Sequence, residues 1–193
     1  MSLTPSTMME LKTRAPDFSL PDVCTGKTVS LSDCSNGQAL LVVFMCAHCP
    51  YVILVESELA AIGRDYQDKG LSMVAISAND AENYPDDTPD KLKAQAEKLG
   101  FSFPYLYDEK QDVAQAYRAA CTPDLYLFDA DQRLVYRGQL DDARPGNDQP
   151  VTGKNLRAAI DSVLAGEPVT ESQLPATGCN IKWKPGNEPD YFG

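Results

Sequence analysis

A nearly uninterrupted apolar run, "QALLVVFM" at positions 38–45, constrains the fold more than any other stretch of the sequence. After the glutamine no polar residue alternates with the apolar ones, so the strand that this run predicts is buried on both faces. Such a strand requires other elements to cover both sides of its sheet. After Pro50 the apolar residues follow the helical period and predict a helix, with buried positions at Val52, Val55, Leu59 and Ile62.

Strands and helices alternate along the rest of the chain. We expect strands at 18–20 and 28–31 joined by a turn at Thr25-Gly26, further strands at 71–77 and 101–108, and two strands within 124–139. The first helix is expected to stop at Gly70, the next to begin after Thr88 with Pro89 in its first turn, and later ones to cover 112–120 and 156–164. A polar loop fills 141–150. This order indicates an α/β fold with a mixed central sheet flanked by helices and an N-terminal β-hairpin.

The length of 193 residues and the 43% apolar content suit one domain whose core needs no disulfide scaffold. We expect an N-terminal extension at 1–14, the domain itself at 15–167 and an irregular tail at 168–193. The tail is rich in proline, glycine and aromatic residues. Its Trp183, Tyr191 and Phe192 are expected to dock on the domain, because aromatic side chains lose favourable burial when they stay in water.

The formal net charge of -11 argues against nucleic acid and membrane partners, because it would repel phosphate backbones and anionic lipids and no basic cluster opposes it. The N-terminal residues contain no apolar segment of signal-peptide length, and no apolar run in the chain is long enough to cross a bilayer. A cytoplasmic location is therefore expected.

The predicted buried strand ends on a CxxC motif, Cys46-Ala47-His48-Cys49. A thiolate at a helix N-terminus is stabilised by the helix dipole and by unpaired backbone N–H groups, so we expect Cys46 to be acidic. Cys49, one turn further on, is expected to be less accessible and able to form a disulfide with Cys46. His48 is expected to donate to the Cys46 sulfur and to favour its thiolate. The motif thus indicates a pair that cycles between dithiol and disulfide.

A CxxC pair is also half of a common zinc site. The chain has no second CxxC and no second histidine, so further ligands would have to come from the remaining cysteines: Cys24, Cys34, Cys121 and Cys179. We therefore favour redox chemistry and expect neither a metal nor another cofactor. Cys24 and Cys34 are interpreted as small core fillers. Cys121 and Cys179 are candidates for an auxiliary thiol near the motif, with core filling favoured for Cys121.

The segment "AACTPDLYLFD" adds a second signal, since Thr122-Pro123 precedes a strand expected beside the first one. With the CxxC motif, it makes the chain resemble the thioredoxin superfamily. The resemblance implies a thioredoxin-like fold, a cis Thr122–Pro123 bond facing the Cys46 sulfur, and a catalytic set that includes Pro123. It also implies a substrate-binding edge formed by Thr122, Pro123, Ala47 and Pro50.

Within this superfamily the N-terminal hairpin "APDFSLPDVCTGKTVSLSD" is similar to that of the redoxin branch, which includes the alkyl hydroperoxide reductase/thiol-specific antioxidant proteins. The tail "GCNIKWKPGNEPDYF" resembles the C-terminus of bacterial redoxin-domain proteins that carry a CxxC. The peroxiredoxin pattern P-x-x-x-T-x-x-C, laid on Cys49, meets Val42 and Cys46 at its proline and threonine positions. The arginine of that family falls at or beside Pro123 and is absent, and Met45 replaces the tryptophan that precedes the first cysteine in thioredoxin.

These features together predict a thiol-disulfide oxidoreductase in which Cys46 attacks a disulfide and Cys49 resolves the mixed disulfide. Its expected partners are protein or small-molecule disulfides and an external thiol reductant. Two alternatives stay open: a thiol peroxidase that uses the same pair, and a metal-binding or redox-sensing module without turnover.

Overall fold

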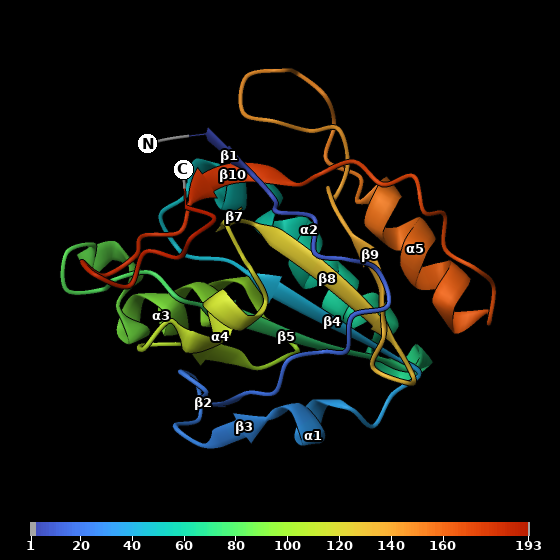
Figure 1. Ribbon diagram of the computed structural model, residues 1–193, viewed down its shortest axis with the longest axis horizontal. Helices are drawn as coiled ribbons and strands as arrows, with labels where there is room; N and C mark the ends of the chain where they lie inside the picture. Colours follow the sequence, from blue (N-terminus) through green and yellow to red (C-terminus); the bar gives the residue numbers. More distant parts are fainter. Residues whose placement is uncertain (1–2, 193) are drawn as a thin grey trace.

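The computed structural model describes residues 3–192 and contains a five-stranded sheet in the order β6-β5-β4-β8-β9 (Figure 1). At its centre lies β4 (Ala39–Phe44), which pairs in parallel with β5 (Leu71–Ser77) and antiparallel with β8 (Asp124–Asp129). The outer strands are β6 (Tyr105–Tyr107), parallel to β5, and β9 (Leu134–Arg137), antiparallel to β8. The predicted mixed sheet is confirmed.

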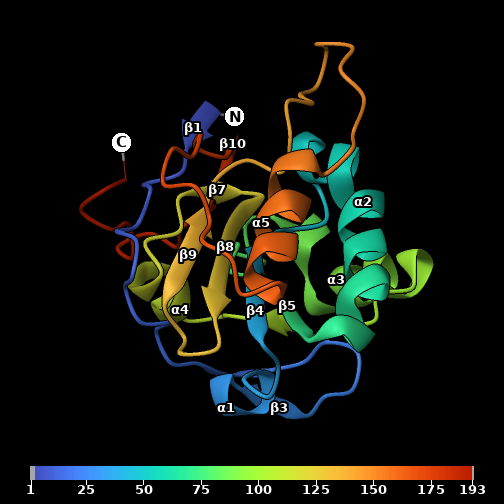
Figure 2. The same cartoon turned by 90° about the vertical axis from the view of Figure 1, so that its right-hand side faces the viewer.

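Helices cover both faces of this sheet. The structure contains α1 (Leu31–Cys34), α2 (Pro50–Tyr66), α3 (Pro89–Leu99), α4 (Asp112–Ala116) and α5 (Lys154–Leu164), with short 3-10 turns η1 (Gln67–Lys69) and η2 (Pro85–Asp87). In Figure 2, α2 and α3 lie to the right of the sheet and α4 lies to its left. Within residues 3–192, no helix combines the length and apolar composition that crossing a bilayer requires.

The central strand is buried along its whole length, as its sequence predicts. Leu41 and Val43 face the core formed with α2, α3 and α5. Val42 and Phe44 face the opposite core, which α4 and the N-terminal segment complete. Each fully buried aliphatic side chain of this size contributes about 1.5–3 kcal/mol, so β4 is a rigid base for the loop that follows it.

The predicted N-terminal hairpin consists of β2 (Ser19–Pro21) and β3 (Thr28–Ser30). Asp22 organises its turn by accepting hydrogen bonds from the backbone N–H and the hydroxyl of Thr25. Gly26 has a φ of 71°, a conformation that glycine adopts without steric cost. The predicted stop of the first helix also agrees, since Gly70 is left-handed with a φ of 98°.

The tail differs from the expectation of an irregular segment, because it contains a strand. Strand β10 (Thr177–Asn180) lies between β1 (Leu3–Pro5) and β7 (Cys121–Thr122) in a separate three-stranded sheet. Its hydrogen-bond partners come from the N-terminal segment and from the residues just before β8, both far away in the sequence, so no local pattern marks it as a strand. Both terminal segments are therefore joined in one sheet (Figure 1).

The aromatic residues of the tail divide into two groups. Trp183 is buried and packs edge-on against Tyr191. The Tyr191 hydroxyl donates to the backbone oxygens of Ala114 and Ala119, so both rings dock as predicted. Phe192 is 46% exposed, and the prediction that it docks is wrong.

Candidate functional site

The CxxC motif occupies the loop between β4 and α2. Pro50 is the first residue of α2 and Cys49 is its N-cap, whose carbonyl oxygen accepts hydrogen bonds from Val52 and Ile53. Proline at the first position favours this start, since its fixed φ suits a helix and it has no N–H to satisfy. The expectation that Cys46 marks the helix N-terminus is therefore wrong: Cys49 takes that place, and Cys46 lies in the loop before it.

Thr122 and Pro123 face the two sulfurs. The antiparallel register pairs Phe44 with Asp124, so the residues before β8 lie beside those that follow β4. The Thr122–Pro123 peptide bond is cis. The Cys46 sulfur lies 3.6 Å from the Thr122 hydroxyl, and the Cys49 thiol donates to the Thr122 carbonyl oxygen at 3.3 Å. Thr122 thus makes the contacts with the cysteine pair that we expected of Pro123.

The two thiols share a proton unequally. Both side chains are fully buried, and the Cys46 thiol forms a hydrogen bond with Cys49 that raises the pKa of Cys46, an effect strengthened by burial and by the charge of Asp87. The same bond lowers the pKa of Cys49, with further bonds from Cys179, Thr122 and the backbone of Val52. The Thr122 carbonyl oxygen opposes the lowering of the Cys49 pKa, because it would face a negatively charged Cys49 sulfur. The pKa shifts of the two thiols therefore have opposite directions, and the pKa of Cys46 is raised where we expected an acidic thiol.

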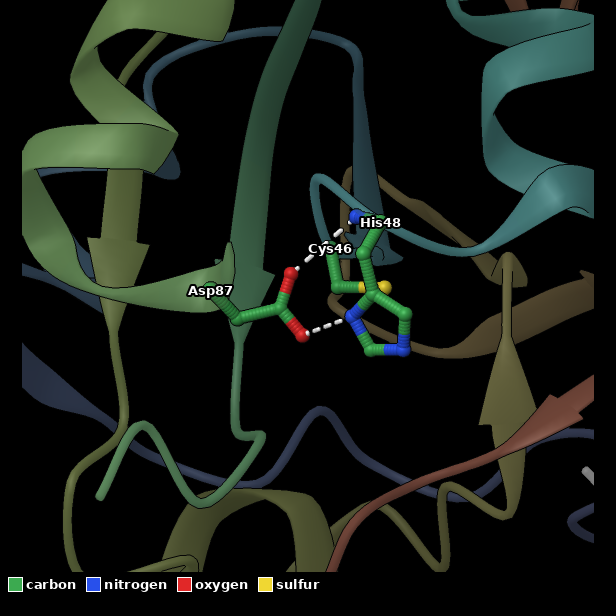
Figure 3. A group of neighbouring side chains, drawn as sticks. All are labelled: Cys46, His48 and Asp87. Carbon is green, nitrogen blue, oxygen red and sulfur yellow. Dashed lines mark hydrogen bonds and ion pairs between the residues drawn. The ribbon is translucent and has the colours of Figure 1, made fainter. Parts of the chain in front are cut away.

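Asp87 fixes the peptide between the two cysteines. Its Oδ1 accepts hydrogen bonds from the backbone N–H groups of Ala47 at 2.8 Å and His48 at 3.2 Å. Its Oδ2 lies 2.5 Å from His48 Nδ1 (Figure 3). The same oxygen accepts a hydrogen bond from the Asn79 side chain at 2.7 Å. The carboxylate is fully buried and every one of these contacts is with a hydrogen-bond donor. Asp87 thus holds the loop in place.

The pairing with Asp87 determines the protonation of His48. The hydrogen bond that His48 donates to the Asp87 carboxylate raises the pKa of His48, although burial works against this rise. Burial alone would raise the pKa of Asp87, but the hydrogen bonds from His48 and Asn79 outweigh it and the pKa is lowered. The expectation that His48 donates to the Cys46 sulfur is not met, because its Nδ1 binds Asp87 instead.

Sequence reasoning missed Asp87 and the polar residues around it. One signal was available: Asn79 follows β5 closely, and the carboxyl ends of neighbouring parallel strands gather polar groups at one sheet edge. A second missed group contacts the backbone of Cys46. The Gln95 side-chain amide donates hydrogen bonds to the Cys46 carbonyl oxygen at 3.4 Å and to the carboxylate of Glu56 at 2.7 Å.

The other cysteines separate into near and far positions. The structure brings Cys179 to Cys49, and their side chains are hydrogen-bonded. Burial, followed by this contact, raises the pKa of Cys179 to about 12. Cys121 is buried next to the site, but its thiol points to the Pro123 carbonyl oxygen at 3.7 Å. Cys34 is buried in the core on the opposite face of the sheet, and Cys24 is half-buried at the N-terminal hairpin.

Among the described residues, Cys46, His48 and Asp87 form a group whose ligand atoms lie within 4.8 Å of one another. The Asp87 oxygens already accept bonds from the loop N–H groups and from Asn79. The 2.5 Å contact between His48 Nδ1 and Asp87 Oδ2 leaves no space for an ion between them. Ion binding at these three residues would require the contact between His48 and Asp87 to break, whereas exchange between the two thiols does not involve that contact.

A small pocket lies beside Pro123 and α2. Its lining includes Tyr51, Val55, Leu140, Arg144 and Thr177. Pro123 lines the same pocket. Of the other predicted substrate-binding residues, Ala47 is half-buried with its N–H bound to Asp87, and Pro50 is exposed at the start of α2.

Residues 11–137 match the AhpC/TSA family. An uncharacterized conserved protein from Geobacillus kaustophilus has a solved structure with a TM-score of 0.94 and 53% identity, over 96% of this chain and 98% of that one. A putative thioredoxin from Neisseria meningitidis gives a TM-score of 0.60 and 26% identity, over 81% of this chain and 92% of its own. A putative peroxiredoxin of Mycobacterium tuberculosis is 27% identical over 124 residues, which is 64% of this chain and 73% of that protein. The predicted thioredoxin-like fold is confirmed, and the chain belongs to the AhpC/TSA family.

Proposed function

We propose that this protein is a thiol-disulfide oxidoreductase that cycles Cys46 and Cys49 between dithiol and disulfide. One observation carries the proposal: two hydrogen-bonded thiols, one in the loop before α2 and one at its N-cap, face Thr122 and the cis Pro123. The likeness to a putative thioredoxin supports the same chemistry. Substrates are protein or small-molecule disulfides, and an external thiol returns the pair to the reduced state.

In the first step, Cys46 attacks one sulfur of the substrate disulfide. Its proton passes to the Cys49 thiolate through the bond that joins the two side chains. A bond forms between Cys46 and the substrate, the substrate disulfide breaks, and the departing thiolate takes up a proton from solvent. The Cys49 thiol then attacks the Cys46 sulfur, the bond between Cys46 and the substrate breaks, and the Cys49 proton leaves with the second substrate thiol. Both cysteines are fully buried, so the loop must open before a substrate reaches Cys46.

Insulin reduction with dithiothreitol tests the activity. The wild type is expected to accelerate the reaction, and Cys46→Ser and Cys49→Ser are expected to abolish the acceleration. Cys34→Ser is the matched control, because Cys34 lies in the core on the other face of the sheet. Normal activity of either CxxC variant would refute the proposal.

Trapping tests the order of attack. Cys49→Ser is expected to accumulate stable mixed disulfides with substrate, whereas Cys46→Ser is expected to accumulate almost none, because release depends on Cys49. Equal trapping by both variants would contradict the assignment of Cys46 as nucleophile.

A thiol peroxidase is the second candidate, favoured by the likeness to a putative peroxiredoxin. Val42 and Cys46 stand where that pattern has its proline and threonine, so no group orients a peroxide for in-line attack. We expect hydrogen peroxide to oxidise the reduced pair orders of magnitude more slowly than it oxidises a dedicated peroxidase. A comparable rate constant in a competition assay would make the peroxidase the preferred function. Zinc analysis of the purified protein tests the metal-binding alternative.

A further inference from the structure

The tail places a third cysteine against the CxxC pair. Strand β10 lies beside β7 (Figure 1). The two strands are antiparallel, and their register places Cys179 opposite Thr122. The approach is very close at Gly178, where a Cβ atom would lie 2.0 Å from the Thr122 carbonyl oxygen. Only glycine allows the tail backbone to lie this near to the residues that contact the pair. The sequence "TGCN" is thus fitted to deliver Cys179 to this place.

Cys179 meets Cys49 at the same carbonyl group. The Cys49 sulfur is 3.3 Å from the Thr122 oxygen, and the Cys179 side chain is hydrogen-bonded to Cys49. Cys179 is 3% exposed and belongs to the same buried cluster as Cys46 and Cys49. Cys49 therefore lies between two other cysteines and is within contact distance of both.

We propose that Cys179 is a third redox thiol, which exchanges with the Cys46–Cys49 disulfide to form a Cys49–Cys179 disulfide. The inference rests on the proposed redox cycle of the CxxC pair. The Cys179 sulfur attacks Cys49, the bond between Cys49 and Cys46 breaks, and Cys46 leaves as a thiolate that takes up the proton lost by Cys179. One disulfide replaces another, so the step requires no external oxidant or reductant.

The environment of Cys179 favours this step only after the pair is oxidised. In the reduced protein, burial and then the bond and charge of Cys49 raise the pKa of Cys179. Formation of the Cys46–Cys49 disulfide removes both contributions of Cys49. The ammonium group of Lys182, held by Asn180 on β10, lowers the pKa of Cys179 and remains in place. Oxidation of the pair thus makes Cys179 a better nucleophile.

The exchange has a chemical consequence for the cycle. It moves the oxidised bond from the loop to the buried junction of α2 and β10 and returns Cys46 as a free thiol. The protein then holds one disulfide while Cys46 can attack a second substrate. Cys121 does not compete for this role, because its thiol is directed at the Pro123 carbonyl oxygen.

Peptide mapping after controlled oxidation tests the proposal. The reduced protein is treated in its folded state with one equivalent of diamide, quenched in acid, alkylated with N-ethylmaleimide and digested with trypsin without reductant. Cleavage after lysine and arginine leaves Cys46 and Cys49 in peptide 28–64 and Cys179 in peptide 158–182. A Cys46–Cys49 disulfide stays inside one peptide, whereas a Cys49–Cys179 disulfide links the two, and dithiothreitol separates them.

We expect both disulfides in the wild type, with Cys46 alkylated in the linked species. Cys46→Ser is expected to give mainly linked peptides. Cys179→Ala is expected to lose the link and the alkylation of Cys46 while it keeps the internal disulfide. Cys34→Ser is the matched control, since Cys34 shares peptide 28–64 and the link must survive its removal.

The wild-type digest is decisive even if a variant fails to fold. An internal Cys46–Cys49 disulfide without linked peptides, in a protein that reduces insulin, would overturn the role of Cys179 and leave the proposed function intact. Absence of both the internal disulfide and the insulin activity would instead refute the proposed function.

Discussion

Replacing His48 with alanine should make the CxxC pair more reducing. The hydrogen bond between His48 and the buried carboxylate of Asp87 raises the pKa of His48 and lowers that of Asp87, so it favours a protonated ring that neutralises the carboxylate. The variant loses the positive charge and keeps the negative one, since Ala47 N–H and the Asn79 side chain still bind the carboxylate. A thiolate exists only in the reduced pair, and the uncompensated negative charge of Asp87 repels it. The reduced form of the variant is therefore less stable relative to the disulfide, so its reduction potential falls.

The geometry sets the scale of the effect. The Asp87 carboxylate and the Cys46 sulfur lie within 4.8 Å of each other. Two unit charges 4.8 Å apart interact with about 3.5 kcal/mol at an effective dielectric constant of about 20. For a two-electron couple, about 1.4 kcal/mol corresponds to about 30 mV, so this interaction corresponds to a shift of about 75 mV. It is smaller when the thiolate charge resides on Cys49, and we expect a fall of some tens of millivolts.

A redox titration against glutathione, followed by alkylation of the remaining thiols, measures this shift. The control is the double variant His48→Ala/Asp87→Asn, which removes both charges and should return the potential close to the wild-type value. The difference between wild type and His48→Ala should also shrink as the pH rises through the pKa of His48, because the wild-type ring then loses its charge. Superimposable curves, a higher potential in His48→Ala, or a double variant that stays reducing would refute the electrostatic argument.

Three further predictions follow from the same contacts. Thiolate absorbance in the ultraviolet should show one ionised thiol in the reduced wild type near neutral pH and none in Cys49→Ser, because the pKa of Cys49 is lowered and that of Cys46 is raised. An undiminished absorbance in the variant would place the charge on Cys46. The raised pKa of His48 should stabilise the folded protein fully below pH 6.5, the ordinary pKa of histidine, and this stability should be lost as the pH rises through the pKa of His48 in the folded protein. The lowered pKa of Asp87 should add stability that is lost as the pH falls below 3.8, the ordinary pKa of aspartate, and through the pKa of Asp87 in the folded protein. Urea midpoints that change with pH identically in wild type and in His48→Ala/Asp87→Asn would contradict both statements. Gly178→Ala should destabilise the fold by about 1–3 kcal/mol, since its Cβ meets a carbonyl oxygen at 2.0 Å, and an unchanged urea midpoint would show that β10 does not lie so close to Thr122.

The elements that the sequence predicts well are those whose burial is set by their own residues. Strand β4 is apolar on both faces, and α2 carries an apolar stripe at helical spacing, so their positions follow from local pattern alone. The hairpin β2–β3 follows in the same way from its turn at Gly26. Strand β10 could not be found by such reasoning, because it is short and its ladder partners lie in β1 and β7.

The features of the site that local sequence predicts also differ from those that depend on contacts between distant segments. The CxxC spacing and the strand that precedes it indicated where the thiols lie and which chemistry they suit. The sequence could not show that the helix begins after Cys49, because Pro50 and the loop contacts decide between neighbouring starting points. Nor could it show that Asp87 binds His48, since these residues are separated by a strand and meet only when the ends of β4 and β5 are side by side.

The layered α/β architecture and the CxxC motif at the end of its central strand can both be predicted from the sequence, because both depend on interactions between near neighbours in the chain. The directions of the pKa shifts of Cys46 and Cys49, the pairing of His48 with Asp87 and the contact of Cys179 with Cys49 are visible only in the folded structure. Each of these depends on burial and on hydrogen bonds between segments far apart in the chain, and such contacts exist only once the strands have paired and the tail has closed over the site.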